Sequence, residues 1–541
     1  MSEQTGERPR ARPAVGALCG IVAAGAGLAA AEAAGLAARP EATPLVAVGG
    51  EVIDATPRPV KELAVSVLGT ADKAVLLAGM ALALAGAAAL LGVLALRRPG
   101  AAGAGVAVFT AIGAAAALDR PDSGALDAVP SLLGGGAAVV VLWLLVARAP
   151  EPTHGQEPRE AAESAAVEAP AGPGARGAGT NRRRFVAAAG AVATVSAVGG
   201  TGARWYAASA AGRGPSSARF TLPEPASPAP PLPEGAELDI AGLDPFFTPN
   251  EDFYRIDTVL SVPRIAASEW RLRLHGRGAA EREYTIADLL NRADLIERDI
   301  TLACVSNPVG GTYVGNARWI GVPLAGLLEE AGVRPPGEGG PADQLVSRSE
   351  DGMTIGTPVA DVMDGRDAML ALGMNGEPLP QRHGFPVRMV VPGLYGYVSA
   401  CKWLVELELT TFEDYDPYWV PRGWAEKAPV KTQSRIDTPG DGANVSAGTV
   451  PVAGVAWAQH RGIEAVEVRV DDGEWQRARL SAEDTADTWR QWVLEWDAEP
   501  GEHRISVRAR DREGGVQTSR ESPTSPDGAT GHHGVAVTVT P

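Results

Sequence analysis

The sequence predicts a multi-domain protein with an N-terminal all-α transmembrane bundle, a central α+β domain and a C-terminal immunoglobulin-like β-sandwich. Three observations support this prediction. Four long apolar runs lie within residues 1–148, strand-like and helical patterns mix over residues 236–410, and only strand patterns occur over residues 411–541. A chain of 541 residues has room for about three units, because a domain usually takes about 100–200 residues.

The four apolar runs cover approximately residues 14–37, 74–96, 101–118 and 128–147. Each run is long enough for a helix to cross a hydrocarbon core of about 30 Å. The runs lack the polar face of a soluble amphipathic helix, which disfavours the alternative of buried helices in a soluble bundle. Their Gly and Ala content is typical of closely packed membrane helices. Residues 1–148 are therefore predicted to form four transmembrane helices.

Positive charges set the expected orientation of these helices. The flanking arginines are Arg8, Arg10, Arg12, Arg97, Arg98 and Arg148. Because the cytoplasmic ends of membrane helices carry an excess of Lys and Arg, the N-terminus and residues 149–180 are expected in the cytoplasm. Residues 149–180 consist largely of Pro, Ala, Glu and Gly, and this composition predicts a disordered linker.

Residues 181–203 begin with the motif NRRRF and continue as a mildly apolar stretch. The arginine run resembles a twin-arginine export signal, although it lies inside the chain. A plain fifth helix with a basic flank is the alternative, and both interpretations give a fifth crossing. A multi-pass protein of the cell membrane is thus expected, with the rest of the chain outside the cytoplasm. The Pro-rich residues 204–235 are expected to form an extended tether.

The central domain combines two kinds of hydrophobic period. Residues 270–276 (WRLRLHG) alternate with the period of a strand. Residues 287–297 (ADLLNRADLIE) and 323–333 (PLAGLLEEAGV) have helical spacing. Residues 236–410 are therefore predicted to form an α+β domain.

The C-terminal residues 411–541 show only strand patterns. Alternation is clearest in residues 465–475, 489–497 and 503–511, which turn residues separate. This spacing is typical of an immunoglobulin-like sandwich. The net charge of −17 argues against nucleic acid as a partner of the chain, because a phosphate-binding surface needs a basic stripe.

Three cysteines and seven histidines limit the cofactors that the chain can bind. The cysteines, Cys19, Cys304 and Cys401, are fewer than the four thiolates of a common iron–sulfur cluster. The sequence contains no Cys-x-x-Cys-His motif for covalent haem, and no histidine lies in an apolar run. We therefore expect neither haem nor an iron–sulfur cluster in this chain.

Three blocks of the central domain resemble the sulfite oxidase family of molybdopterin enzymes. Residues 301–333 contain a Cys-x-x-Asn motif followed by Ala-x-Trp-x-Gly-Val-x-Leu. Residues 374–404 resemble the family's second block, and residues 253–258 (FYRIDT) resemble the loop that leads to the cofactor. The resemblance implies a sulfite-oxidase-type fold, a molybdenum–molybdopterin cofactor with one pyranopterin, and a sandwich like the family's dimerisation domain. It leaves open whether this chain forms a homodimer.

The resemblance assigns Cys304 as the thiolate ligand of molybdenum, a metal for which sulfur ligands are suitable. From the residues alone, a buried structural cysteine or a disulfide with Cys401 is the alternative; Cys401 itself is interpreted as a core residue. The pterin phosphate needs fixed cations, of which Arg suits it best. By resemblance the cofactor-binding residues are Tyr254, Arg255, Asp257, Cys304, Ser349, Asp351, His383, Arg388, Ser399 and Lys402. Asp257 departs from the family, in which many members carry His at this place.

The substrate pocket is expected beside the metal, and its residues are also assigned by resemblance. They are Cys304, Arg255, Trp319, Tyr418, Arg422, Trp424 and Arg461. Aromatic walls with a few cations suit a small oxyanion, although interdomain packing is an alternative role for the aromatic residues. Sulfite oxidases usually carry arginines shortly after the metal cysteine, whereas this chain has Pro308 and Val309. A less charged substrate than sulfite, such as an S-oxide, is therefore favoured.

The predicted function is a membrane-anchored, extracytoplasmic molybdenum oxidoreductase. It would transfer an oxygen atom with two electrons to or from a small molecule, by sulfite-type oxidation or S-oxide reduction. A catalytically silent binding module that keeps the fold is the alternative, and a transporter is disfavoured because Glu32 is the main ionisable residue in the apolar runs. Electrons are expected to pass to or from a quinone or a cytochrome, and the sequence does not distinguish these partners.

Overall fold

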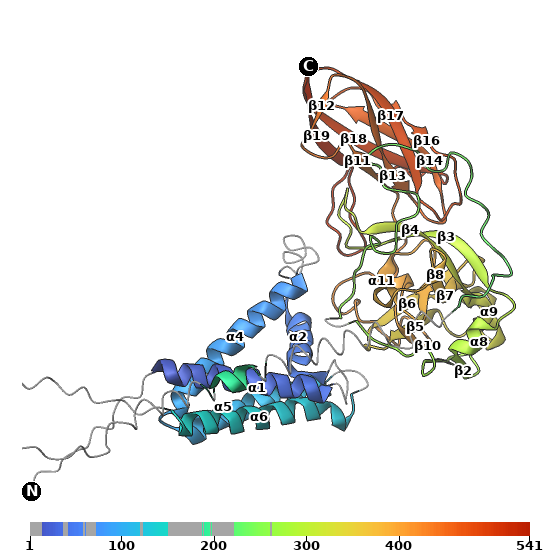
Figure 1. The fold of residues 1–541 in the computed structure, drawn as a ribbon. Helices are drawn as coiled ribbons and strands as arrows, with labels where there is room; N and C mark the ends of the chain where they lie inside the picture. Colours follow the sequence, from blue (N-terminus) through green and yellow to red (C-terminus); the bar gives the residue numbers. More distant parts are fainter. Residues whose placement is uncertain are drawn as a thin grey trace, which may run out of the picture. The chain divides into compact units, whose positions relative to one another are not determined.

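The computed structural model describes residues 13–35, 42–57, 60, 72–119, 123–149, 187, 189–194, 196, 221–259 and 262–541. The chain divides into two compact units, an N-terminal helical unit and a C-terminal unit that contains residues 221–258 and 262–541 (Figure 1).

The described part of the N-terminal unit is helical. Its helices are α1 (Pro13–Gly35), α2 (Pro44–Ala55), α4 (Asp72–Ala95), α5 (Pro99–Leu118), the 3-10 helix η3 (Ala125–Ala128) and α6 (Val129–Ala147). Four segments are long and apolar enough to cross a membrane: Pro13–Gly35, Val75–Ala95, Pro99–Leu118 and Ala125–Ala147. They coincide with the four predicted runs. The short helix α2 has no counterpart among the predicted elements, because its twelve residues fall below the length of a span.

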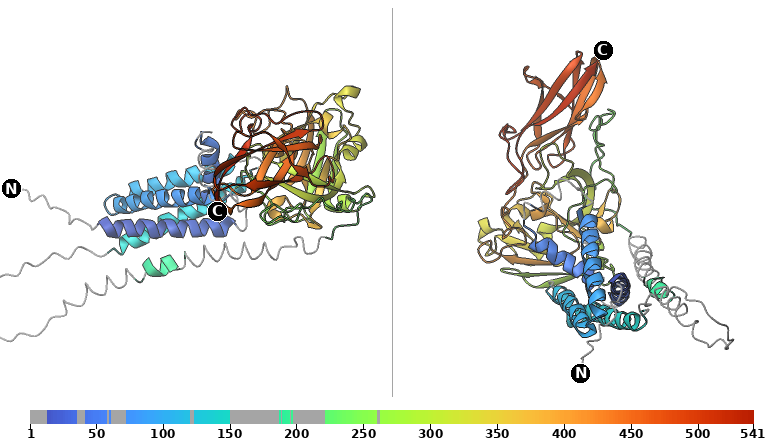
Figure 2. Two further views of the ribbon diagram at one scale, coloured as in Figure 1. Left: turned by 90° about the horizontal axis from the view of Figure 1, so that it is seen from above. Right: turned by 90° about the vertical axis from the view of Figure 1, so that its left-hand side faces the viewer.

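Small residues bring the long helices into backbone contact, as their composition predicted. A Cβ atom built on Gly20 of α1 would lie 1.8 Å from the carbonyl oxygen of Ala88 in α4. One on Gly27 would lie 2.7 Å from the carbonyl oxygen of Gly134 in α6. Larger side chains would force these helices apart, so glycine sets the interhelical distance. The long helices lie side by side in the further views of the chain (Figure 2).

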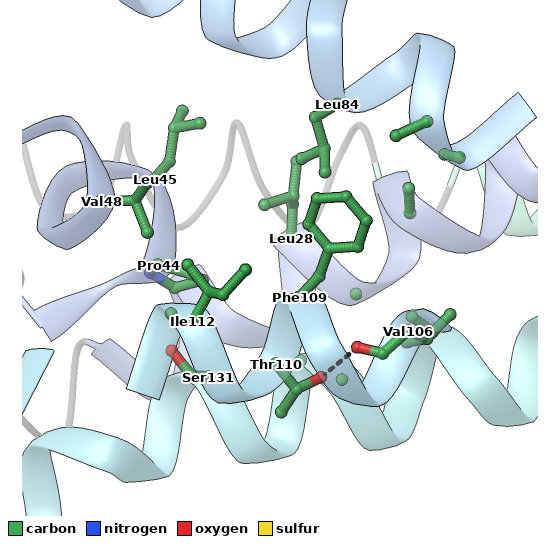
Figure 3. Close-up of a pocket in the computed structure, with 18 of the residues that line it drawn as sticks. Leu28, Pro44, Leu45, Val48, Leu84, Val106, Phe109, Thr110, Ile112 and Ser131 are labelled. Atoms are coloured by element: carbon green, nitrogen blue, oxygen red, sulfur yellow. Dashed lines mark hydrogen bonds between the residues drawn. The ribbon is translucent and has the colours of Figure 1, made fainter. Parts of the chain in front are cut away.

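A cavity of about 470 Å³ lies between the helices of the bundle, with apolar side chains around most of it (Figure 3). Leu28, Leu84 and Phe109 line it from three helices. The hydroxyl of Thr110 donates to the carbonyl oxygen of Val106 at 2.9 Å, within its own helix. The cavity lining contains no ionisable side chain among the described residues.

Some predicted segments fall mainly outside the described residues. In the predicted fifth helix, residues 187, 189–194 and 196 are helical. The arginine run at 182–184, the linker at 150–180 and residues 204–220 lie outside the described chain. The twin-arginine signal and the disordered linker therefore stay predictions.

The central domain contains two five-stranded sheets. The first has the order β2-β1-β10-β5-β6 and the second β3-β4-β7-β8, with β9 paired to β7. The strands are β1 (Arg271–Gly276), β2 (Arg282–Thr285), β3 (Ile296–Ala303), β4 (Val314–Pro323), β5 (Gln344–Ser349), β6 (Thr354–Pro358), β7 (Met369–Met374), β8 (Glu377–Pro378), β9 (Arg388–Val390) and β10 (Leu404–Thr410). The helices are α8 (Ile286–Leu290), α9 (Leu324–Glu330), η5 (Pro336–Glu338), α10 (Val359–Val362), η6 (Gln381–His383) and α11 (Gly396–Ser399). The domain is thus α+β, as predicted.

Local periodicity explains several of these elements. In β1 the predicted alternation places Leu272 and Leu274 in the core, with arginines outside. Helix α9 lies within the predicted segment 323–333. The helix predicted over 287–297 is wrong beyond Leu290, because Ile296 already starts β3. There, antiparallel pairing of β3 with β4 overrides the local helical spacing.

The remaining strands form a β-sandwich, which confirms the predicted all-β architecture (Figure 1). One sheet has the order β11-β13-β17-β16 and the other β12-β19-β18-β14-β15. The strands are β11 (Gln433–Thr438), β12 (Ala443–Ser446), β13 (Gly448–Trp457), β14 (Ile463–Val470), β15 (Gln476–Arg477), β16 (Arg479–Leu480), β17 (Arg490–Ala498), β18 (Gly501–Asp511) and β19 (His533–Thr540). Val466, Trp492 and Ile505 are fully buried in the core between the sheets.

The sandwich and the central domain meet through buried polar contacts. The indole N–H of Trp489 donates to the carbonyl oxygen of Phe246, and the amide of Gln459 donates to that of Thr301, both at 2.9 Å. Residues 411–432 connect the two domains between the last strand of one and the first strand of the other. The exact boundary, placed at 410/411 from the sequence, stays a prediction.

Residues 221–235 are the described part of the Pro-rich segment before the central domain. They are extended, and they bind to the surface of that domain. The backbone of Ser227 accepts from the N–H of Glu297 at 2.9 Å and donates to Leu295 at 3.1 Å. Leu222 and Leu232 pack against the main core. The tether prediction is therefore wrong for this part of residues 204–235, because apolar side chains between the prolines bind the domain.

Candidate active site around Cys304

Cys304 lies immediately after β3, at the start of the loop of residues 304–313 that leads into β4. The backbone N–H of Cys304 donates to the carbonyl oxygen of Tyr313 at 2.9 Å. The side chain of Asn307 accepts from the N–H of Tyr313 at 2.9 Å, and the N–H of Asn307 donates to the carbonyl oxygen of Cys304. These bonds close the loop and fix the direction of the thiol. The Cys-x-x-Asn spacing thus has a structural reason.

The Cys304 thiol is buried and weakly hydrogen-bonded. It is 6% exposed, and its sulfur accepts from the backbone N–H of Ser306 at 3.4 Å. Burial raises the pKa of the thiol, an effect that this N–H partly offsets. Cys304 and Cys401 are both free thiols, so the alternative of a disulfide between them is wrong. Cys401 lies in the main core, as predicted.

A cluster of cationic side chains is buried close to Cys304. Burial lowers the pKa of Arg388 to about 10 and the pKa of Lys402 to about 8. Burial also lowers the pKa of His383 to about 3, so its ring is neutral near pH 7 and its Nε2–H donates to the carbonyl oxygen of Asn250 at 2.8 Å. Buried cations are costly unless anions lie beside them. Among the described residues no carboxylate forms an ion pair with Arg388, so a negatively charged group beside it would offset the cost of burying its charge.

Asp257 connects two of the predicted cofactor residues. Its carboxylate accepts from Lys402 Nζ at 2.7 Å, from Arg255 Nε at 2.7 Å and from Arg255 Nη2 at 3.1 Å. The Asp257 side chain is only 5% exposed, so these charge-assisted bonds are largely shielded from water. The aspartate that departs from the family pattern thus holds the ammonium and guanidinium groups together.

Polar atoms without partners surround the same cations. Within the described chain, Gln381 Oε1 and Arg388 Nε are buried and have no hydrogen-bond partner, and the buried Ser349 Oγ and Asp351 Oδ1 are satisfied at most by each other. Burial also raises the pKa of Asp351, whose charge interacts with Lys402. Buried polar atoms are normally satisfied, so a group of them beside buried cations indicates a polar ligand. The residues present fit an anionic, hydrogen-bonding cofactor.

Three other predicted residues contribute in different ways. Tyr254 lies close enough to Cys304 and Arg388 for their charges to interact, and burial raises its pKa. The Ser399 hydroxyl donates to the carbonyl oxygen of Leu394 at 3.0 Å, so its proton is used within its own turn. Trp319 is fully buried and lies under the Arg388 guanidinium, 5.0 Å from ring centroid to Cζ. The Trp319 ring therefore packs against the Arg388 side chain and is not exposed to solvent.

Comparisons with known proteins agree with this geometry. Residues 259–419 match the family described as oxidoreductase molybdopterin binding domain. The chain is 32% identical over 324 residues to sulfite oxidase of Gallus gallus, covering 51% of this chain and 69% of that protein. The chain belongs to the sulfite oxidase family. Residues 433–507 of this family member match the bacterial Ig domain, which confirms that the C-terminal sandwich is immunoglobulin-like.

Two further relatives of this sulfite oxidase family chain cover it in part. Mitochondrial sulfite oxidase of Mus musculus is 31% identical over 321 residues, which are 51% of this chain and 58% of that enzyme. The chain therefore spans less than two thirds of the mammalian enzyme's length. The structure of the sulfane dehydrogenase SoxCD from Paracoccus pantotrophus aligns with a TM-score of 0.47 at 23% identity, over 55% of this chain and 84% of that one.

The predicted pocket residues of the sulfite oxidase family chain lie in two places. Arg422 donates to the carbonyl oxygen of Tyr418 at 2.7 Å and stacks on its ring, while Trp424 packs near Tyr397. Arg461 lies in the sandwich, where its Nε donates to Asp511 at 3.1 Å. Each of these side chains is held by contacts within the protein. Its predicted role in the substrate pocket therefore stays a prediction.

Tyr395, whose charge interacts with that of Cys304, and Lys431, whose backbone N–H donates to the Tyr395 hydroxyl at 3.5 Å, were not singled out from the sequence of this family member. Tyr395 is 4% exposed, and its charge interacts with those of Cys304 and Arg461; burial raises its pKa to about 12. Lys431 donates from Nζ to Asp527 at 2.9 Å and to the carbonyl oxygen of Gly528 at 2.7 Å. Tyr395 lies inside a block that carries the family resemblance. Lys431 has no sequence signal, because only the fold brings it near Tyr395.

Proposed function

We propose that the chain is a membrane-anchored molybdenum–molybdopterin oxidoreductase that performs two-electron oxygen-atom transfer on a small substrate outside the cytoplasm. One observation carries the proposal. In a member of the sulfite oxidase family, a buried thiol follows β3 beside buried cations and polar atoms without partners. Such an arrangement suits a cofactor that brings both an anionic group and a metal with affinity for sulfur.

Each residue of the site has a proposed task. When bound, the molybdenum cofactor supplies two-electron redox chemistry that protein side chains lack. Cys304 would provide the protein thiolate, and Arg388 and Lys402 would bind the terminal phosphate. Ser349 and Asp351 would offer their buried side-chain oxygens to the pterin ring.

Two reaction directions satisfy this proposal. In sulfite-type oxidation, sulfite and water give sulfate, two protons and two electrons. In S-oxide reduction, the S-oxide takes up two protons and two electrons and gives the sulfide and water. The 304–313 loop carries Pro308 and Val309 where arginines are usual, and Arg461 is already paired with Asp511. The weak cationic character of the pocket favours a neutral or singly charged substrate.

The proposed topology places the N-terminus in the cytoplasm and the catalytic half outside. Four apolar spans support membrane anchoring, and the arginine positions support the orientation. The fifth crossing, with its twin-arginine motif, would carry the remainder of the chain across the membrane. A quinone or a cytochrome is the proposed electron partner, and the sandwich is the proposed surface if the chain dimerises.

The alternative is an anchored module that keeps the fold without catalysis. Metal and pterin analysis of the purified full chain separates the two. We expect one molybdenum and one pterin per chain, together with redox-dye turnover of sulfite or a sulfoxide. Cys304→Ser is expected to abolish turnover, whereas Cys401→Ser, in the core, is expected to retain much of it. A wild-type chain without stoichiometric molybdenum would support the silent module.

A further inference from the structure

The C-terminal sandwich contacts the loop that carries Cys304. Arg435 of β11 donates from Nη1 to the carbonyl oxygen of Gly311 at 3.2 Å. Its side chain is only 4% exposed, and the carboxylates of Asp244 and Asp437 accept from its remaining nitrogens at 2.5 Å. Two carboxylates therefore hold the guanidinium in one orientation. The sandwich thus presents a fixed donor to the 304–313 loop.

His533, at the start of β19, touches the same loop. Its Nδ1 accepts from the backbone N–H of Ile436 at 3.0 Å, which fixes the ring. A Cβ atom built on Gly310 would lie 2.1 Å from Cδ2 and 2.2 Å from Nε2 of this ring. Gly310 also has a φ of +75°, a conformation that other residues rarely adopt. The loop can take its course only because residue 310 has no side chain at the His533 edge.

The strand before Cys304 is held by the sandwich as well. The N–H of Thr301 in β3 donates to the carbonyl oxygen of Asp487, and Gln459 donates to the carbonyl oxygen of Thr301, both at 2.9 Å. The backbone N–H of Trp489 donates to the Thr301 hydroxyl at 2.7 Å. Cys304 thus lies where β3 meets the 304–313 loop, and the second domain is bonded to both segments.

We infer that Arg435 and His533 are positioning residues for Cys304, through which the sandwich sets the place of the thiol. This inference rests on the proposed function, because Cys304 is there the metal ligand. A small displacement of a reacting group is costly: an error of about 1 Å lowers the rate by about a hundredfold. Loosening the loop should therefore lower kcat while leaving substrate binding and cofactor retention largely intact.

His533→Asn in the full chain is the decisive variant. The Asn side-chain oxygen can accept from Ile436 in place of Nδ1, whereas the ring edge against Gly310 is lost. We expect the amides of Asn307, Gly311 and Tyr313 to exchange hydrogen about tenfold faster, which corresponds to about 1.4 kcal/mol of opening free energy. We also expect an altered Mo(V) electron paramagnetic resonance spectrum and a kcat lowered about tenfold, at unchanged KM and molybdenum content.

The matched control is His503→Asn, the same substitution at a histidine of β18 that bonds to Asp471. It should change none of these readouts. A double-mutant cycle of Gly310→Ala and His533→Asn is a second test. Because Gly310 and His533 are in contact, the effects of the two substitutions on kcat should be non-additive.

Three results would overturn the inference. The first is loop exchange and a Mo(V) spectrum in His533→Asn that match those of His503→Asn. The second is strictly additive effects of Gly310→Ala and His533→Asn. The third is a change in KM alone. If the wild-type chain holds no molybdenum, the proposed function fails, and hydrogen exchange of the loop still decides whether the sandwich positions Cys304.

Discussion

Replacing Asp257 with Asn should lower the stability of the cofactor-free chain and raise its affinity for phosphate. Asp257 accepts three bonds from Lys402 and Arg255 while only 5% exposed. Breaking a buried ion pair costs about 3–5 kcal/mol, but Arg255 is 34% exposed and contributes less because water screens it. We therefore expect Asp257→Asn to lower the free energy of unfolding of the cofactor-free chain by about 3 kcal/mol, at the lower end of that range.

The same substitution removes a negative charge that competes with a bound phosphate for both cations. One more charged hydrogen bond is worth about 1.5–3 kcal/mol, or about tenfold to a hundredfold in affinity. The gain should depend on pH, because Asp257 raises the pKa of Lys402, which burial lowers to about 8. Without Asp257 this pKa falls further, so the gain is expected at pH 6 and should shrink at pH 8.

Urea unfolding of the cofactor-free full chain, with inorganic phosphate as the probe, measures both effects. At pH 6, Asp257→Asn should unfold at lower urea and gain more stability from phosphate than the wild type gains. Glu329→Gln, at an exposed carboxylate on α9, is the control and should change neither quantity. Unchanged stability together with weaker phosphate binding at pH 6 would refute the role assigned to Asp257.

Three further predictions concern export, substrate charge and acid stability. Replacing the arginines at 182–184 with Lys should stop protease outside intact cells from reaching the catalytic half, because a twin-arginine receptor distinguishes Arg from Lys; unchanged access would favour a plain fifth helix. Val309→Arg should raise kcat/KM for sulfite and Arg461→Ala should lower it, each about tenfold or more; efficient wild-type turnover that Arg461→Ala leaves unaffected would contradict the proposed pocket. His383 has a folded pKa of about 3, whereas the unfolded chain binds this proton near the ordinary 6.5. Stability should therefore fall as pH drops below about 6.5, by about 1.4 kcal/mol per unit, and His383→Gln should flatten this slope in urea unfolding.

The sequence pattern predicted a helix or strand correctly where the hydrophobic period of the segment matches the side chains that the fold buries. The alternation of β1 and the apolar face of α9 bury the same side chains that the periodicity identified. The segment 287–297 failed because its second half pairs with β4, a long-range interaction that the helical period does not contain. For the same reason, Leu222 was assigned to a tether although it packs on the core.

The candidate site divides in a similar way. The motif located Cys304 and the cations of the second block, because their places are encoded in short spacings. The bond between Asp257 and Lys402 joins residues 145 positions apart, and Arg435 reaches its loop across 124 positions. No local pattern predicts such pairs. The roles of Asp257, Arg435 and His533 therefore follow only from the fold.

The Pro-rich segment has a practical consequence for the catalytic half as a separate fragment. Strand β3 is at one end of its sheet, and unpaired strand edges invite other chains to add to them. Ser227 covers this edge at Ile296, and neighbouring prolines cannot donate to an incoming strand. A fragment that begins at residue 236 would expose the edge and remove Leu222 and Leu232 from the core. A fragment that begins at residue 221 would keep the segment that covers the edge of β3 and should therefore aggregate less.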